Sequence, residues 1–345
     1  MRRLLPLLLV AVLAGSALGD DAPAAGRESP PPMDSSTGES SLWRPDWGLG
    51  PLEWSDQFLL AVTHLNLGPA SPRTLHEHEV MIALRGDLSR TESDYFPRDI
   101  VIDGEVVQAT AVIRYGLTDR VQLALEVPMV WRWEGVLDPF IRRVESIYGN
   151  VRGERRDLAS NMFRVEGTTD DGAPFKLGPG VGLAKTTLGA KIRLLDGAPA
   201  WYPALSFETI FALPTGMSTF GTKGIDTGIR LAASKRAGDF VFYWGGAGMA
   251  FAGNEGPIKL EPVKGVAFLG LEFEVEPWLS LIYEGWVHSP GERNLQGHRG
   301  LVVYQGLGLK ALFGHAFVEV GLAEDFGDIT RAGDVNSHLE VGYTF

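Results

Sequence analysis

Residues 338–345 read HLEVGYTF, and this stretch decides the fold class of the chain. Leu339, Val341, Tyr343 and Phe345 are apolar or aromatic, and polar or small residues stand between them. Successive side chains of a β-strand point to opposite faces. The stretch therefore predicts a strand with one apolar and one polar face, ending on an aromatic residue. In a soluble protein such an ending can arise by chance, so the fold class also has to be supported by the rest of the chain.

The N-terminus predicts a secretory signal peptide over residues 1–19. Arg2 and Arg3 precede an apolar stretch from Leu4 to Ala14, and small residues follow at 17–19. The apolar stretch is shorter than the roughly 20 residues that a membrane-spanning helix needs; a retained anchor is the less favoured alternative. The chain has no cysteine, which excludes an acylated N-terminal cysteine, disulfides and a thiolate metal site.

A signal peptide together with the terminal strand favours an all-β, transmembrane, up-and-down antiparallel β-barrel, integral to the outer membrane of a Gram-negative bacterium. The hydrophobic fraction of 45% suits a barrel, because only alternate residues of each strand face lipid. Its expected partners are outer-membrane lipid and the barrel assembly machinery, which would read Tyr343 and Phe345. The net charge of −12 argues against nucleic acid. A periplasmic β-sandwich or soluble barrel is the weaker alternative.

Alternating strands follow one another from about Leu75 onward. The clearest hairpin is 107–127, and similar alternation recurs at 205–213, 267–275, 279–287 and 316–322. We count about twelve strands, an even number that places both the N-terminus and the last strand's end in the periplasm. Residues 57–66 are a plug or a periplasmic segment; alternatively, with 42–53 as a partner, the barrel has fourteen strands.

The domain organisation follows from these patterns. Residues 20–56 are expected to be a flexible periplasmic segment, because a Pro- and Ser-rich stretch buries too little apolar surface to order itself. The barrel is expected over 57–345. Trp43, Trp47 and Trp54 are expected to anchor at the membrane interface, with docking onto the barrel as the alternative. Further aromatic residues near strand ends predict interfacial girdles: Tyr115, Trp131, Trp133, Trp201, Tyr202, Trp244, Trp278 and Tyr304.

One long connection, 134–178, interrupts the rhythm on the expected extracellular side. Its first part has helical spacing, and Asp138-Pro139 is a suitable helix start. We expect an amphipathic helix that acts as a lid or, equally, as a passive cap. Its residues are Leu137, Asp138, Phe140, Ile141 and Val144.

Several short blocks carry a resemblance to a known family. They are Asp103-Gly104-Glu105, residues 114–120, Glu126-Val127-Pro128, residues 135–138 with Phe140-Ile141, Leu213-Pro214-Thr215-Gly216, residues 324–326 and Asp334-Val335. In this order they resemble the bacterial outer-membrane proteins grouped as domain of unknown function 3187, over about residues 100–345. The resemblance implies an outer-membrane barrel and no activity. Residues 149–153 depart from the family's pattern after the expected helix.

Alternation also predicts which charged side chains line the lumen. In a narrow barrel these groups would pair and close it, and in a wider one they would line a channel. The slight acidic excess predicts a preference for cations if a pore exists. The predicted lumen charges are Arg114, Glu126, Lys185, Lys191, Arg193, Glu208, Asp226, Arg230, Glu272, Glu274, Glu284, Lys310, Glu319 and Glu340.

No catalytic, cofactor-binding or metal site is predicted. His288 and Ser289 are adjacent, so a regular strand places their side chains on opposite faces. The His288 imidazole then cannot take the proton of the Ser289 hydroxyl, which a serine nucleophile requires. The alternating His76-Glu77-His78-Glu79 lacks further metal ligands. The favoured function is a narrow, porin-like channel or transporter for a small solute rather than an enzyme. The alternatives are a closed barrel with a structural or surface-interaction role and, third, a lipid-modifying enzyme.

Overall fold

The computed structural model describes residues 47–93, 100–139, 143, 161–197, 202–252, 256–295, 300–325 and 335–345. The chain forms two compact units, Met1–Glu39 and Ser40–Phe345, and every described residue lies in the second. In that described part, no helix is long and apolar enough to cross a membrane.

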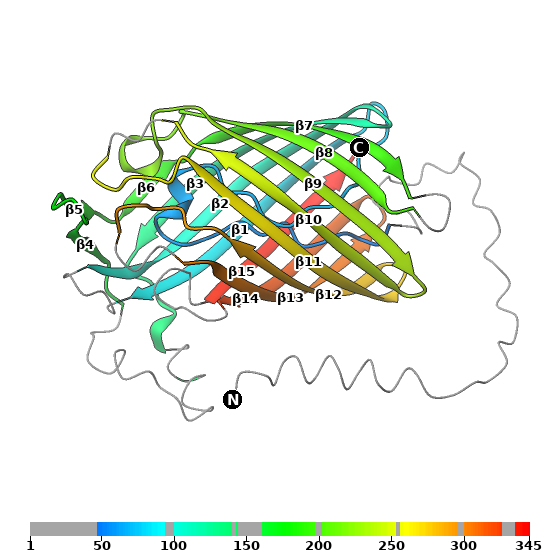
Figure 1. Cartoon of the computed structure of the whole chain (residues 1–345). Coiled ribbons are helices and arrows are strands. Elements are labelled where there is room, and N and C mark those ends of the chain that lie inside the picture. Colours follow the sequence, from blue (N-terminus) through cyan, green and yellow to red (C-terminus); the bar gives the residue numbers. More distant parts are fainter. Residues whose placement is uncertain are drawn as a thin grey trace, which may run out of the picture. The chain divides into compact units, whose positions relative to one another are not determined.

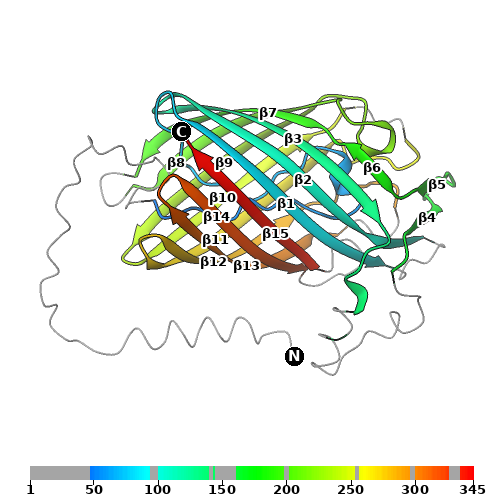
Figure 2. The ribbon, with the colours of Figure 1, turned by 180° about the vertical axis from the view of Figure 1, so that it is seen from behind.

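Fifteen strands in the described residues form one sheet, and twelve of them close into a ring once β4, β5 and β6 are set aside (Figure 1). Ring closure comes from antiparallel pairing of β1 with β15, which lie side by side in Figure 2. The ring strands are β1 (Val80–Ser93), β2 (Val101–Thr118), β3 (Val121–Trp133), β7 (Thr186–Asp196), β8 (Ala204–Leu213), β9 (Asp226–Ala237), β10 (Phe240–Ala250), β11 (Val263–Glu276), β12 (Leu279–His288), β13 (Val302–Phe313), β14 (Ala316–Asp325) and β15 (Val335–Thr344).

Three short strands and two 3₁₀ turns complete the described elements. Strands β4 (Arg164–Thr168) and β5 (Pro174–Leu177) form a hairpin that pairs with the start of β2. Strand β6 (Gly180–Leu183) pairs with the end of β3 and continues toward β7. The 3₁₀ turns are η1 (Ala61–Thr63) and η2 (Ser218–Phe220). The expected barrel of twelve strands is confirmed, and the fourteen-strand alternative is wrong.

Burial alternates along the ring strands as the sequence pattern predicts. In β15, His338 and Glu340 face inward and are buried, whereas Leu339, Val341 and Tyr343 are exposed on the outside. Such an apolar outer surface suits contact with lipid chains. Tyr304 departs from the expected aromatic girdles: only 1% of it is exposed, and it faces the lumen.

The two ends of the ring differ in their connections. Four turns at one end consist of two residues each: 119–120, 238–239, 277–278 and 314–315. Gly238 and Gly314 adopt positive φ values of 64° and 66° there, a conformation that favours glycine. The connections at the other end are longer, and the longest joins β3 to β7 through β4–β6. We call these the short-turn end and the long-loop end.

The lumen contains a segment of the same chain, residues 47–75, which we call the inner segment (the blue trace inside the ring in Figure 1). Residues 47–56, expected in the flexible N-terminal part, are instead buried in the ring together with 57–75. Of the alternatives for residues 57–66, the plug is the one observed. Trp47 and Trp54 are 3% and 2% exposed, so interfacial anchoring is wrong for both.

Candidate functional site in the barrel lumen

The inner segment follows a hairpin-like path through the barrel. At the short-turn end, Trp47 Nε1 donates to the backbone oxygen of Asp196 at 3.0 Å. The segment reaches the long-loop end, where Phe58 and Leu60 pack in a cluster with residues of β2, β4 and β5. It then returns, and Thr74 Oγ1 donates to the backbone oxygen of Asp119 at 2.8 Å, back at the short-turn end. The segment therefore has a first leg, residues 47–57, a tip, residues 58–63, and a second leg, residues 64–75.

Strand carboxylates hold the first leg by its backbone. Glu272 Oε1 accepts a hydrogen bond from the Leu49 N–H at 2.7 Å, and its Oε2 accepts from Gly50 at 3.2 Å. Glu284 Oε1 accepts from the Leu52 N–H at 2.8 Å. An irregular buried segment has no sheet ladder to satisfy its N–H groups, so side-chain acceptors must do so. These two predicted lumen charges thus bind the inner segment.

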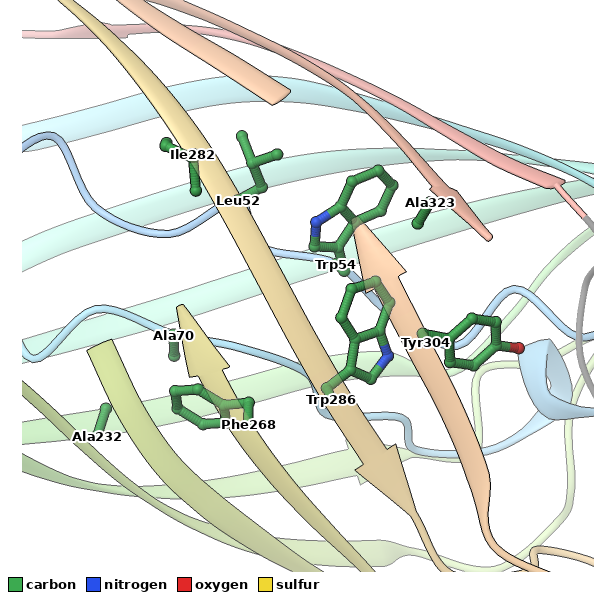
Figure 3. Close-up of a cluster of buried hydrophobic side chains, with 9 residues drawn as sticks. All are labelled: Leu52, Trp54, Ala70, Ala232, Phe268, Ile282, Trp286, Tyr304 and Ala323. Atoms are coloured by element: carbon green, nitrogen blue, oxygen red, sulfur yellow. The ribbon is translucent and has the colours of Figure 1, made fainter. Parts of the chain in front are cut away.

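Trp54 packs into a recess formed by aromatic rings and glycines. Its ring stacks on Trp286 with centroids 5.6 Å apart, and Trp286 stacks in turn on Tyr304 at 5.2 Å (Figure 3). A Cβ atom on Gly321 would lie 2.7 Å from the Trp54 ring, so that strand position must be a glycine for the ring to fit. We call strands β10–β13, which carry most of these contacts, the anchoring wall.

An ion pair fixes the first leg to the same wall near its tip. Asp56 Oδ2 lies 2.9 Å from Lys264 Nζ, and both side chains are buried. Tyr304 Oη donates to the other Asp56 oxygen at 3.1 Å. His288 Nδ1 lies 3.5 Å from Asp56, whereas the neighbouring Ser289 Oγ accepts from the Gly265 N–H. His288 and Ser289 therefore face different partners.

Facing the anchoring wall is a second surface, strands β1–β3, β7 and β8, which we call the charged wall. Glu53 meets it: Arg85 Nη2 donates to Glu53 Oε2 at 3.0 Å, and Arg114 Nη2 donates to the same oxygen. Arg85 also donates to Glu340 at 2.6 Å and lies 3.6 Å from Glu126. This ion-paired layer, formed by Glu53, Arg85, Arg114, Glu126 and Glu340, joins the middle of the first leg to the neighbouring strands β15, β1, β2 and β3.

The strand register brings several further charges together. Glu208 faces Arg230 across β8 and β9, with Nη2 and Oε2 2.6 Å apart. Lys310 faces Glu319 across β13 and β14 at 2.5 Å. Two lumen cations bind backbone oxygens of the second leg: Lys191 Nζ donates to Ser71 at 3.2 Å, and Arg230, through Nη1, also donates to Gly68 at 3.3 Å.

The remaining predicted lumen charges lie nearer the two ends. Lys185 is 2.7 Å from Asp226, which also accepts the Leu65 N–H at 3.0 Å. Arg193 lies over the Trp47 ring and pairs with Asp196 at 2.7 Å. Glu274 pairs with Arg236 at the short-turn rim.

Two cavities remain between the inner segment and the ring. One, of about 60 Å³, lies toward the short-turn end, lined by residues that include Met81, Arg114, Gln122, Lys191, Lys310 and Glu319. The other, of about 90 Å³, lies toward the long-loop end, lined by residues that include Arg85, Thr110, Glu126, Lys185, Glu208 and Arg230. Glu53 lines both cavities, so its layer divides them. Among the described lining residues, Lys310 is the one contributed by the anchoring wall.

The long-loop end is organised around buried carboxylates. Glu105 Oε1 accepts the N–H groups of Val136 and Leu137 at 2.9 and 2.6 Å. Asp138 lies 2.6 Å from Arg90 Nε and accepts the Asn161 N–H at 2.6 Å. Asp138, Pro139 and Arg143 are helical, but Phe140, Ile141 and Val144 lie outside the described residues. The lid helix therefore stays a prediction.

Glu319, His338 and Glu340 are close enough to share a metal ion, with potential ligand atoms within 4.8 Å of one another. Both ring nitrogens of His338 already face carboxylates, Asp87 at 2.7 Å and Glu319 at 3.0 Å. Lys310 and Arg85 occupy oxygens of Glu319 and Glu340. Ion pairing accounts for this cluster, and we assign no metal to it.

Sequence reasoning missed Arg85, Glu53, Asp56 and Lys264. Arg85 could have been found, because Ile82, Leu84 and Leu88 alternate with it and place it on the inner face. Glu53 and Asp56 gave no such signal, since the inner segment has no strand periodicity. Tyr343 and Phe345, the expected assembly signal, are exposed at the short-turn end, where Phe345 exchanges backbone hydrogen bonds with Val80.

A model of a protein family of unknown function, DUF3187, matches residues 40–345. The chain belongs to the DUF3187 family. Two of the short sequence blocks that carry the resemblance meet at the long-loop end: Glu105 from the first binds the backbone of the block at residues 135–138.

A solved structure of an outer-membrane channel shares the fold. The chain is similar to the COG4313 outer membrane channel from Pseudomonas putida F1, with 17% identity, a TM-score of 0.55 and coverage of 81% of this chain and 100% of that one. More distant matches include the NanC porin (6% identity, TM-score 0.44, covering 76% and 98%) and the toluene transporter TodX of P. putida (11%, 0.36, 86% and 98%). A search of curated proteins found no match.

Proposed function

We propose that this protein is a gated, narrow outer-membrane channel for small polar solutes, with the inner segment as its gate. The observation that carries the proposal is the asymmetric fit of that segment. It packs closely against the anchoring wall but leaves two polar cavities beside the charged wall. Similarity in fold to an outer-membrane channel supports the proposal. In barrels of this class the short turns face the periplasm, so we also propose that the inner segment enters from there.

The proposed path runs along the charged wall and crosses the Glu53 layer. Both cavities are lined by Glu53. Of the two arginines bound to its carboxylate, Arg114 lines the short-turn cavity and Arg85 the long-loop cavity. In the closed state these ion pairs block a solute. Opening moves the first leg so that Glu53 leaves the arginines and the cavities join. The energetic cost of moving it is the loss of buried contacts around Leu52 and Trp54.

A disulfide lock tests whether the inner segment moves. The chain has no cysteine, so Leu52→Cys with Gly308→Cys provides the sole pair. A Cβ atom on Gly308 would lie 2.3 Å from Leu52 Cδ1, so the two positions are neighbours. It would also lie 2.4 Å from the Val320 backbone oxygen, so the strand backbone has to shift locally to admit the cysteine, and the Gly308→Cys single variant measures the effect of that shift. We expect unit conductance in a planar bilayer under reducing conditions, its loss on oxidation and its return with a reductant. Equal conductance in both states would sink the gating mechanism; each single-cysteine variant is the control.

The loop at residues 134–178 supplies a second proposed gate. Glu105 and Asp138 tie the start of this loop to β2 and to Arg90. Deletion of residues 135–150 should raise conductance if the loop acts as a lid. No change would assign gating to the inner segment alone.

A closed barrel with a structural or surface-interaction role is the second candidate. The apolar cluster at the tip favours it, because Phe58 and Leu60 pack with Ile102, Phe175 and Leu295 at the long-loop end. Folded protein that gives no conductance, together with loss of surface binding on removal of the 134–178 loop, would support this role over the channel.

A further inference from the structure

The Glu53 carboxylate lies where a ligand of the charged wall would lie. One oxygen receives N–H groups from two guanidinium groups, Arg85 Nη2 at 3.0 Å and Arg114 Nη2. Paired guanidinium groups are well suited to carboxylates, because their planar donors match the geometry of the two oxygens. Glu53 reaches this site from the inner segment, whereas both arginines belong to the ring.

Partners of the lumen charges are divided unequally between the ring and the inner segment. The ring acids Glu208, Glu319 and Glu340 pair with ring cations, Arg230, Lys310 and Arg85. By contrast, Arg114 pairs with Glu53, and Lys191 donates to the backbone oxygen of Ser71. Withdrawal of the inner segment therefore removes partners mainly from cations of the charged wall.

The excess of acidic side chains on the ring strands does not cancel the positive charge that is left when the inner segment withdraws from the charged wall. Glu272 and Glu284 are on the anchoring wall, where they accept backbone N–H groups of the first leg. Asp226 is paired with Lys185. Four other predicted acids do line the cavities, namely Glu126, Glu208, Glu319 and Glu340. Six ring cations line them as well: Arg85, Arg114, Lys185, Lys191, Arg230 and Lys310. The described ring surface beside the cavities is therefore net positive when Glu53 leaves.

We propose that Arg85 and Arg114, with Lys191 nearby, form a binding site for a small carboxylate solute, and that Glu53 occupies this site in the closed state. The inference rests on the proposed channel function and names its substrate class. A solute carboxylate would replace Glu53 between the arginines and leave no buried guanidinium unpaired, which would otherwise be costly. Because solute and Glu53 compete for one site, the solute favours the displaced segment and thereby opens its own path.

Chemical rescue tests the site without any need for conduction. Glu53→Ala removes the internal carboxylate and leaves its space between the arginines. Sodium acetate should then raise the melting temperature of the folded variant by about 2 °C or more relative to sodium chloride at equal ionic strength. Wild-type protein, whose site is filled, should gain less. Acetamide, which has the same shape without charge, should have no effect on either protein.

Three variants make the test specific. Adding Arg114→Gln to Glu53→Ala should abolish the gain from acetate. Glu284→Ala, which also removes a buried carboxylate from the lumen but one bound to a backbone N–H, should show no gain. If Glu53→Ala refolds poorly, the yield of folded barrel with and without acetate gives the same comparison, and Glu53→Gln keeps the side-chain shape.

The outcomes separate this inference from the channel proposal. An acetate gain restricted to variants lacking Glu53 supports the site even if the barrel is silent in a bilayer. Conductance without that gain, or an equal gain from sulfate, would falsify the carboxylate site and leave the channel standing. In a conducting Glu53→Ala barrel, the reversal potential under a potassium chloride gradient should show anion preference, opposite to the cation preference that the strand charges alone predict.

Discussion

The two walls of the lumen make different kinds of contact with the inner segment. On the anchoring wall, carboxylates bind backbone N–H groups and an aromatic recess holds Trp54, so shape and hydrogen bonding are both satisfied. On the charged wall, ion pairs with Glu53 add to apolar contacts of Leu49 and Val62 with β1–β3, and the packing leaves cavities of about 60 and 90 Å³. The inner segment can therefore stay packed on the anchoring wall, and keep the barrel folded, while its ion pairs with the charged wall break and that side opens.

The strongest test of this contrast removes the aromatic contact. Trp54→Ala should lower the free energy of unfolding by about 3–5 kcal/mol, the usual cost of truncating a large buried aromatic residue. It should also raise conductance, because the first leg loses its main packing contact with the ring. Urea unfolding of the refolded barrel measures the first effect and planar-bilayer recording the second.

Trp131→Ala is the matched control, since this tryptophan is 45% exposed on the outer surface. An equal loss of stability in both variants, with unchanged conductance, would show that the recess does not anchor the segment.

A smaller effect is expected from breaking the buried pair near the tip. Asp56→Asn leaves Lys264 without its carboxylate partner, and an unpaired buried charge is costly. We expect a loss of about 3 kcal/mol. Lys264→Met in the same chain should recover part of it, because the uncompensated ammonium is then gone. A double-mutant cycle on the unfolding free energies provides the measurement; additive losses would mean that the two groups are not coupled.

The smallest effect on stability should come from the charged wall. Glu126 lies 3.6 Å from Arg85 and its side chain is 29% exposed, so Glu126→Gln should cost less than about 1 kcal/mol. Its effect should appear in ion selectivity, since the long-loop cavity loses a negative charge. The reversal potential should shift toward anions. A shift toward cations would place the conduction path elsewhere.

Strand periodicity accounts for the part of this fold that could be predicted. The alternation at 338–345 and at 107–127 identifies the inner and outer faces because a sheet repeats every two residues. Placing both ends of the barrel in the periplasm requires an even number of strands, which excludes a barrel of thirteen strands. The same alternation places Arg114, Glu208 and Glu340 in the lumen, since the residues on either side of each belong to the outward face.

The inner segment could not be predicted in the same way. Its path depends on contacts between residues far apart in the chain, such as Leu49 with Glu272 and Leu52 with Glu284. Nothing local distinguishes a tryptophan that anchors in lipid from one that packs on Trp286, so the sequence predicts the wrong environment for Trp54. Tyr304 was misplaced for the same reason: its hydroxyl has a buried partner in Asp56 that its position near a strand end does not reveal.

The hairpin path of the inner segment has a consequence for assembly. Trp47 and Thr74 both lie at the short-turn end, so the segment enters and leaves the ring through one opening. The chain therefore need not be threaded through the barrel: β15 can join β1 first, and the segment can be inserted afterwards as a loop. Although residues 47–75 are synthesised before every ring strand, they can be the last part of the barrel to fold.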